Sequence, residues 1–383
     1  MPVSYSDGIR YIMSGSGVNS HSDKNGALSG YRVLDLTDGK GEFCSCLLAN
    51  MGAQIIKVRN PEADLTGNIA PFPSKTTNVS NFFGEKNIDK LHITLDINTK
   101  VGREIFKRLV EVTDVVVESN PAGYLAELGL DYRKIREINH RLVMASITNF
   151  GQSGPYQYYK SCDLVASALG GSMYVSGEHH MPPLKPFGNQ AYCSAGLFAA
   201  IGVLLALWKR RTTHMGQHID ISVTECVAAT LDHVLVRYFY QGVVAKRQGS
   251  LSWNNAFRIF PCSDGYIVLS LFQQWSTLVE LLDADGMAED LIDTKWLGNQ
   301  ERVVNLEHII EVLTRWTQGH TVAELVKKGQ SMRFPWAEVA AVSRLANNPQ
   351  LRKRNFFAEV EHRQYGKNYR RSEVPYKLNW TPR

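Results

Sequence analysis

Side chains that could act as nucleophiles or metal ligands are scattered along this chain and form no recognisable motif. Six cysteines occur without a CxxC pair, and no histidine stands at a spacing typical of zinc sites. His179 and His180 are adjacent in a loop flanked by Gly and Pro, where a metal role is the disfavoured interpretation. Cys193 is more simply a packing residue than a reactive thiol. We therefore expect reduced thiols and no metal site.

Glycine-rich motifs that bind phosphates or present a nucleophile are also missing. No GxGxxG follows the first expected strand, and the chain contains no P-loop and no GxSxG sequence. A nucleotide-dependent oxidoreductase therefore stays only as an alternative, and a plain dehydrogenase or NTPase is disfavoured.

Composition and charge set broad limits on function. The chain has 383 residues, a formal net charge of +5 and a pI of about 8.8. A mild positive charge suits an anionic small ligand. The basic residues cluster most densely at 352–354, but no nucleic-acid-binding module accompanies them, so we expect a solvated face and no nucleic-acid partner.

Segments that could target the chain to a membrane are not predicted. Residues 1–30 lack the apolar core of a signal peptide. The most apolar run, 195–208, is shorter than the roughly 20 residues that span a bilayer and is expected to be a buried helix. We expect a cytoplasmic protein without a membrane partner.

Strands and helices alternate through the first half of the chain, which predicts a parallel α/β sheet whose strand ends could bind a nucleotide. A long helix at 222–240 and a β-rich segment at 256–271, turning at 263–265, indicate a change of architecture. The predicted organisation is a flexible extension at 1–28, a large domain beginning at 29–225, a small α+β domain at 226–325 and a return to the large domain at 326–383. Expected strands lie at 31–37, 53–59, 93–96, 114–118 and 142–147, and expected helices at 43–51 and 99–112.

An ordered series of segments resembles the class III CoA-transferases, the family of formyl-CoA transferase, carnitine CoA-transferase and α-methylacyl-CoA racemase. The resemblance implies a Rossmann-like large domain with a small α+β domain, in ring-shaped subunits that interlock as a dimer. It also implies that the chain binds CoA or acyl-CoA as a substrate, holds no permanent cofactor and acts on carboxylic acids. The segments lie at 30–37, 51–59, 94–96, 113–118, 128–130, 149–155, 163–171 and 215–222.

The CoA-binding positions that this resemblance implies follow the expected strands. Glycines would let the backbone approach the ligand, and cations would meet its phosphates. The implied residues are Gly39, Lys40, Gly41, Lys57, Arg59, Asn87, Lys90, Ser119, Asn120, Gly123 and Leu128.

The aspartate that carries the acyl group in the family is missing at its expected position. With Gly196 as the alignment point, the nucleophile position holds Tyr192, and no Asp or Glu occurs from 179 to 219. Tyrosine cannot form the acyl anhydride, because the family mechanism requires a carboxylate that is both nucleophile and acyl carrier. Asn189, Gln190 and Tyr192 remain as polar groups of an acyl pocket.

Other departures from the family pattern leave two interpretations of the chemistry. Glu127 and Thr148 replace cations of the family, and Cys162 with Asp163 stands where the racemases have a His-Asp pair. Asp163 is either a relocated nucleophile or the N-cap of a helix at 164–169. We favour a subunit that lacks the nucleophile and pairs with an Asp-containing paralogue, as in heteromeric members such as benzylsuccinate CoA-transferase. An active CoA-transferase with a relocated nucleophile, for which Asp163 is the candidate, is the alternative.

Overall fold

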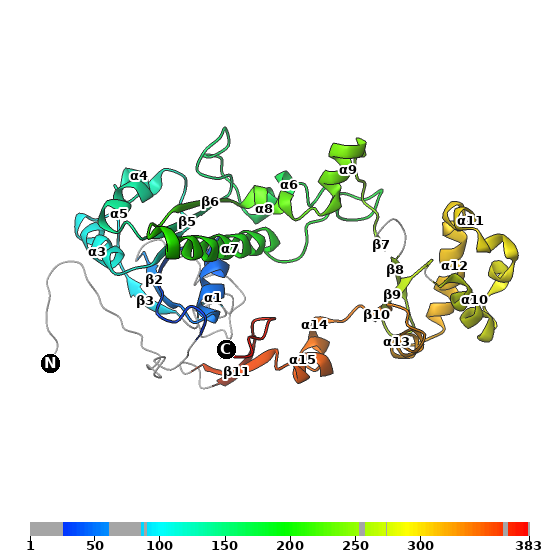
Figure 1. Cartoon of the computed structure of the whole chain (residues 1–383). Helices are drawn as coiled ribbons and strands as arrows, with labels where there is room; N and C mark the ends of the chain where they lie inside the picture. The colour runs from blue at the N-terminus through cyan, green and yellow to red at the C-terminus, as the bar shows by residue number, and fades with distance from the viewer. Residues whose placement is uncertain are drawn as a thin grey trace. The chain divides into compact units, whose positions relative to one another are not determined.

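The computed structural model describes residues 26–60, 86–87, 90–252, 257–272, 274–362 and 367–381 (Figure 1). The predicted extension at 1–28 lies almost wholly outside these residues. The chain forms two compact units. The first comprises Met1–Tyr174, Leu184–Ala245 and Lys353–Arg383, and the second comprises Val175–Pro183 and Lys246–Arg352. The division into domains at 225/226 and 325/326 stays a prediction.

A six-stranded parallel sheet organises the first unit, with the strand order β3-β2-β1-β4-β5-β6. β4 and β5 are buried along their whole length, as expected of central strands covered on both faces. The order reverses between β1 and β4, which makes their carboxyl ends the topological switch point of the sheet. The strands are β1 (Arg32–Leu36), β2 (Gln54–Arg59), β3 (Leu91–Thr94), β4 (Val115–Glu118), β5 (Val143–Thr148) and β6 (His218–Ser222).

Helices cover both faces of this sheet. One core contains small and apolar side chains of α1, α7 and α8, and the other contains those of α3 to α5. Gly196 lets α7 approach α1 closely, because a Cβ atom there would lie 2.9 Å from Phe43 Cβ. The helices of this unit are α1 (Glu42–Asn50), α3 (Lys100–Glu111), α4 (Tyr124–Glu127), α5 (Tyr132–Ile138), α6 (Asp163–Leu169), α7 (Gln190–Thr213), α8 (Val223–Ala229) and α9 (His233–Gln241). A further helix, α15 (Pro349–Lys353), belongs to the second unit except for its last residue.

The central helix α7 extends beyond the predicted 195–208. Among the described residues it is the one helix whose length and apolar composition would allow it to cross a membrane, a test that core helices also pass. Its alanines pack into the core between the sheet and α1, which agrees with the expectation of a buried helix on that face.

The predicted helix at 222–240 is wrong, because the chain breaks between α8 and α9. Thr230 ends α8, with its hydroxyl donating to the Val227 carbonyl at 2.8 Å. Asp232 then adopts a left-handed φ of 48°, which a continuous helix cannot contain.

The second unit is built on an antiparallel sheet of order β10-β9-β8-β7, which confirms the β-rich segment and its turn. Trp316, Trp336 and Phe334 fill its core. Its strands are β7 (Leu251–Ser252), β8 (Phe257–Pro261), β9 (Tyr266–Ser270) and β10 (Ala337–Glu338). Its helices are α10 (Trp275–Ala284), η3 (Glu289–Ile292), η4 (Thr294–Leu297), α11 (Asn299–Val304), α12 (Leu306–Gln318), α13 (Val322–Ser331) and α14 (Val342–Leu345). The hairpin β11 (Phe357–His362) and β12 (Lys367–Ser372) belongs to the first unit.

Candidate functional site

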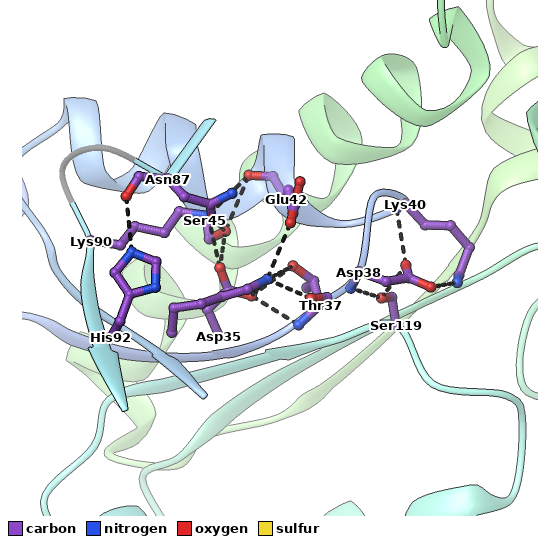
Figure 2. A network of polar contacts seen from close by, with 11 residues as sticks. Asp35, Thr37, Asp38, Lys40, Glu42, Ser45, Asn87, Lys90, His92 and Ser119 are labelled. Carbon is purple, nitrogen blue, oxygen red and sulfur yellow. Dashed lines mark hydrogen bonds and ion pairs between the residues drawn. The ribbon is translucent and has the colours of Figure 1, made fainter. Parts of the chain in front are cut away.

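Polar side chains from β1 and β4 meet at the switch point (Figure 2). The N–H of Asp38 donates to Ser119 Oγ at 2.7 Å, and the same hydroxyl lies 2.7 Å from Asp38 Oδ1. The ammonium group of Lys40 pairs with Asp38 Oδ2. Gly41 allows the tight turn into α1, because a Cβ atom there would collide with Thr37 Cγ2 at 2.5 Å. The structure thus brings two predicted CoA-binding residues, Lys40 and Ser119, onto one aspartate that the sequence analysis does not single out.

A buried cluster of charges lies under this turn. Asp35 and Glu42 are 0% exposed, and Lys57 and Lys90 are 2% and 6% exposed. Lys90 Nζ lies 2.8 Å from both Asp35 Oδ2 and Ser45 Oγ. Lys57 Nζ lies 3.4 Å from Asp35 Oδ1 and 3.5 Å from Glu42 Oε1. The positive charges of the two lysines therefore balance the negative charges of the two carboxylates inside the protein, away from solvent.

This cluster holds the turn in place. Burial would raise the pKa of Asp35, but the nearby charges of Lys57 and Lys90 outweigh it and keep the pKa well below its usual value. Asp35 Oδ1 accepts hydrogen bonds from the Thr37 N–H at 2.8 Å and hydroxyl at 2.6 Å, and Lys57 donates to the Thr37 carbonyl. Both lysines are engaged by protein groups, so a phosphate at either would have to compete with these contacts.

The other predicted CoA-binding residues lie at the strand ends or in α4. Arg59 ends β2 and is partly exposed. Asn87 is 2% exposed, and its carbonyl is 3.3 Å from His92 Nε2. Gly123 caps α4 with a left-handed φ of 85°, a conformation that favours glycine. Three further residues of the set are half-buried: Gly39, Asn120 and Leu128.

Tyr192 lies in the first turn of α7, where its backbone meets Asp163. The Tyr192 N–H donates to Asp163 Oδ1 at 3.1 Å, and Lys185 Nζ lies 2.8 Å from Asp163 Oδ2. Asp163 is 5% exposed. It is the first residue of α6, whose N-cap is Cys162, so the predicted N-cap role for the helix at 164–169 is wrong. Instead, Asp163 accepts a hydrogen bond from an N–H in the first turn of α7, where the side chain of the N-cap Asn189 forms no capping hydrogen bond.

The hydroxyl of Tyr192 is a poor nucleophile in this environment. Burial raises its pKa well above the usual value, and the negative charges of Asp38 and Asp163 add to the effect. Because the charge of Asp38 acts on the Tyr192 hydroxyl, Tyr192 lies near the switch point. Gln190 is exposed, and its Nε2 donates to the Phe187 carbonyl at 3.1 Å. In the ranges that the structure describes, no three His, Cys, Asp or Glu side chains form a metal-binding group.

A parallel sheet of this order, joined in one chain to an antiparallel unit, defines a two-unit α/β protein. The family model for CoA-transferase family III matches residues 28–383, and the chain belongs to that family. The predicted family and the predicted α/β fold class are thereby confirmed, while the interlocked dimer stays a prediction. A solved CAIB/BAIF family protein from Brucella suis superposes with a TM-score of 0.85 at 28% identity, covering 93% of this chain and 94% of that one.

Curated relatives of similar length are CoA-transferases. The chain is 30% identical over 368 residues to succinyl-CoA:(R)-benzylsuccinate CoA-transferase subunit BbsE of Thauera aromatica, covering 92% of this chain and 89% of the relative. It is 31% identical to succinyl-CoA:mesaconate CoA-transferase of Haloarcula hispanica, covering 88% and 86%. It is 30% identical to the human succinyl-CoA:glutarate CoA-transferase, covering 89% and 78%.

Proposed function

We propose that this chain binds CoA or an acyl-CoA at the carboxyl ends of β1 and β4 and serves in CoA transfer between carboxylic acids as the subunit that lacks the nucleophile. CoA enters as a substrate, and no resident cofactor is required. Lys40, Ser119 and the turn at 37–41 would contact the nucleotide part, because they converge at the switch point. Arg59, at the end of the neighbouring β2, supplies a cation for phosphate.

The environment of Tyr192 is the observation that supports the proposal that this chain lacks the nucleophile. A phenol whose pKa is raised by burial cannot replace a carboxylate as acyl carrier. The alternative nucleophile, Asp163, has one oxygen bonded to the Tyr192 N–H and the other paired with Lys185. An attack by Asp163 on a thioester would have to break both contacts. This favours the nucleophile-lacking subunit over an active enzyme with a relocated nucleophile.

A second chain would then supply the carboxylate. One of the relatives is itself named as a subunit, which gives this arrangement a parallel. An apolar stripe on α7 supports a protein partner, since Leu205 and Trp208 are 62% and 69% exposed and continue a row that begins at Leu197 and Ile201. We infer an interlocked dimer of ring-shaped subunits, either with an Asp-containing paralogue or with a second copy.

The acyl donor to test first is succinyl-CoA, because that compound is named in the three relatives described above. The nucleotide-dependent oxidoreductase has less support. The strand order of the six-stranded sheet would suit a dinucleotide, but the turn after β1 lacks the glycine motif that binds the pyrophosphate of a dinucleotide.

Isothermal calorimetry of the full chain with CoA and succinyl-CoA tests the binding. We expect saturable binding of both. Binding of neither, by the chain alone or co-purified with a paralogue, would refute the proposal. Tight binding of NAD instead would favour the oxidoreductase.

A further inference from the structure

Glu118 is a buried carboxylate that the proposed reaction does not use. It ends β4 directly before Ser119 and is 3% exposed. Its Oε2 accepts hydrogen bonds from the Asn120 N–H at 2.7 Å and from Asn120 Nδ2 at 3.1 Å. Burial raises its pKa, although hydrogen bonds from Ser146 and Asn120 and the charge of Lys40 act in the opposite direction. The switch point thus contains a carboxyl group that is costly to keep charged.

Hydrogen-bonding groups connect Glu118 to the surface across three adjacent strands. Ser146 is the partner of Glu118 in the register of β4 and β5, which places the two side chains on the same face of neighbouring strands. Ser146 Oγ lies 2.9 Å from Nε2 of His218, the first residue of β6. The His218 ring stacks on Tyr132 with centroids 5.5 Å apart, and the residue is exposed. A buried carboxyl group is therefore linked to an imidazole in contact with water.

A proton can move along this path without the loss of a hydrogen bond. In the charged form Ser146 would donate to Glu118, and His218 Nε2 would donate to Ser146 across the 2.9 Å contact. On uptake, the Ser146 proton passes to Glu118, the Nε2 proton passes to Ser146, and His218 Nδ1 takes one proton from water. Burial lowers the pKa of His218, against the charges of Asp220 and Asp131, so the ring is neutral and can exchange tautomers.

We propose that binding of an anionic ligand at the switch point is coupled to the uptake of one proton by Glu118, with Ser146 and His218 as the path to water. This inference rests on the proposed function, because CoA supplies the anion. Its diphosphate brings negative charge to a site where Lys40 already pairs with Asp38. Neutralising Glu118 removes a repulsion, while its Oε2 remains able to accept both hydrogen bonds from Asn120.

Calorimetry near pH 7 in two buffers of different ionisation enthalpy measures the uptake. Dephospho-CoA is the probe, because its diphosphate has no group that titrates near neutral pH. We expect the wild-type chain to take up a fraction of one proton per ligand. Glu118→Gln, a neutral mimic of the protonated group, should take up none and bind at least as tightly. Glu137→Gln, which changes an exposed carboxylate on α5, should retain the wild-type uptake.

A second variant tests the same path in case Glu118→Gln does not fold. Ser146→Ala removes the acceptor for the carboxyl proton, so the uptake should fall while thermal unfolding confirms an intact fold. Equal uptake by wild type and Glu118→Gln, or wild-type binding without any uptake, would overturn the inference alone. A wild-type chain that binds neither dephospho-CoA nor CoA would remove the proposed function and this coupling together.

Discussion

Replacing Lys90 by Met should strongly destabilise the first unit. The cluster balances Lys57 and Lys90 against Asp35 and Glu42, and the Lys90 side chain is fully buried with contacts of 2.8 Å to Asp35 and Ser45. Removing one cation leaves an uncompensated buried negative charge, which costs about 3–5 kcal/mol. A domain of this size loses about 2–4 °C in Tm per kcal/mol, so we expect the transition to fall by roughly 10 °C.

Differential scanning calorimetry of the full chain measures this change, with Lys107→Met as the matched control. Lys107 pairs with Glu104 at 2.9 Å on the exposed face of α3. Such a surface pair contributes about 0.2–1 kcal/mol, so the control should shift the transition by only a few degrees. If Lys90→Met shifts it no more than Lys107→Met does but abolishes CoA binding, then Lys90 serves the ligand and our account of the cluster is wrong.

Three further predictions concern the ligand, the start of α7 and the assembly. Arg59→Ala should weaken CoA binding by about 1.5–3 kcal/mol in calorimetry. Arg133→Ala, which removes an exposed side chain on α5, should leave the affinity unchanged. Equal losses of affinity in the two variants would contradict a contact between Arg59 and phosphate. Asp163→Ala should cost about 0.5–2 kcal/mol in thermal unfolding, because an N–H in the first turn of α7 loses its acceptor. An unchanged Tm would exclude that role. Sedimentation at micromolar concentration should show a dimer that Leu205→Glu with Trp208→Glu weakens, and a well-folded wild-type monomer would argue against the assembly.

The sheet could be predicted from the sequence where strands are buried on both faces. Val115–Val117 and Val143–Ile147 form short apolar runs between turn signals, and both are strands. β6 is not among the predicted strands, because in His218–Ser222 only Ser222 is buried, and its pairing with β5 joins residues more than 70 positions apart.

The sequence predicts which candidate residues follow the strands, but it does not predict the contacts that their side chains make. The turn at 39–41 and Ser119 do lie together, since carboxyl ends of neighbouring parallel strands share one edge. The pairing of Lys57 and Lys90 with Asp35 and Glu42 could not be inferred, because it depends on the directions of side chains from three elements and from the segment before β3. An aspartate before a helix suggests a local cap, whereas Asp163 contacts the start of a different helix 29 residues later.

The central claim is that this chain contributes a CoA site but no acyl-carrying carboxylate. Incubation with succinyl-CoA, alone and with a co-expressed Asp-containing paralogue, followed by borohydride or hydroxylamine trapping and peptide mass spectrometry, tests it most directly. The account predicts that every peptide of this chain stays unmodified and that the trapped group is on the paralogue's aspartate. A trapped carboxylate at Asp163, or at any other position of this chain, would contradict it.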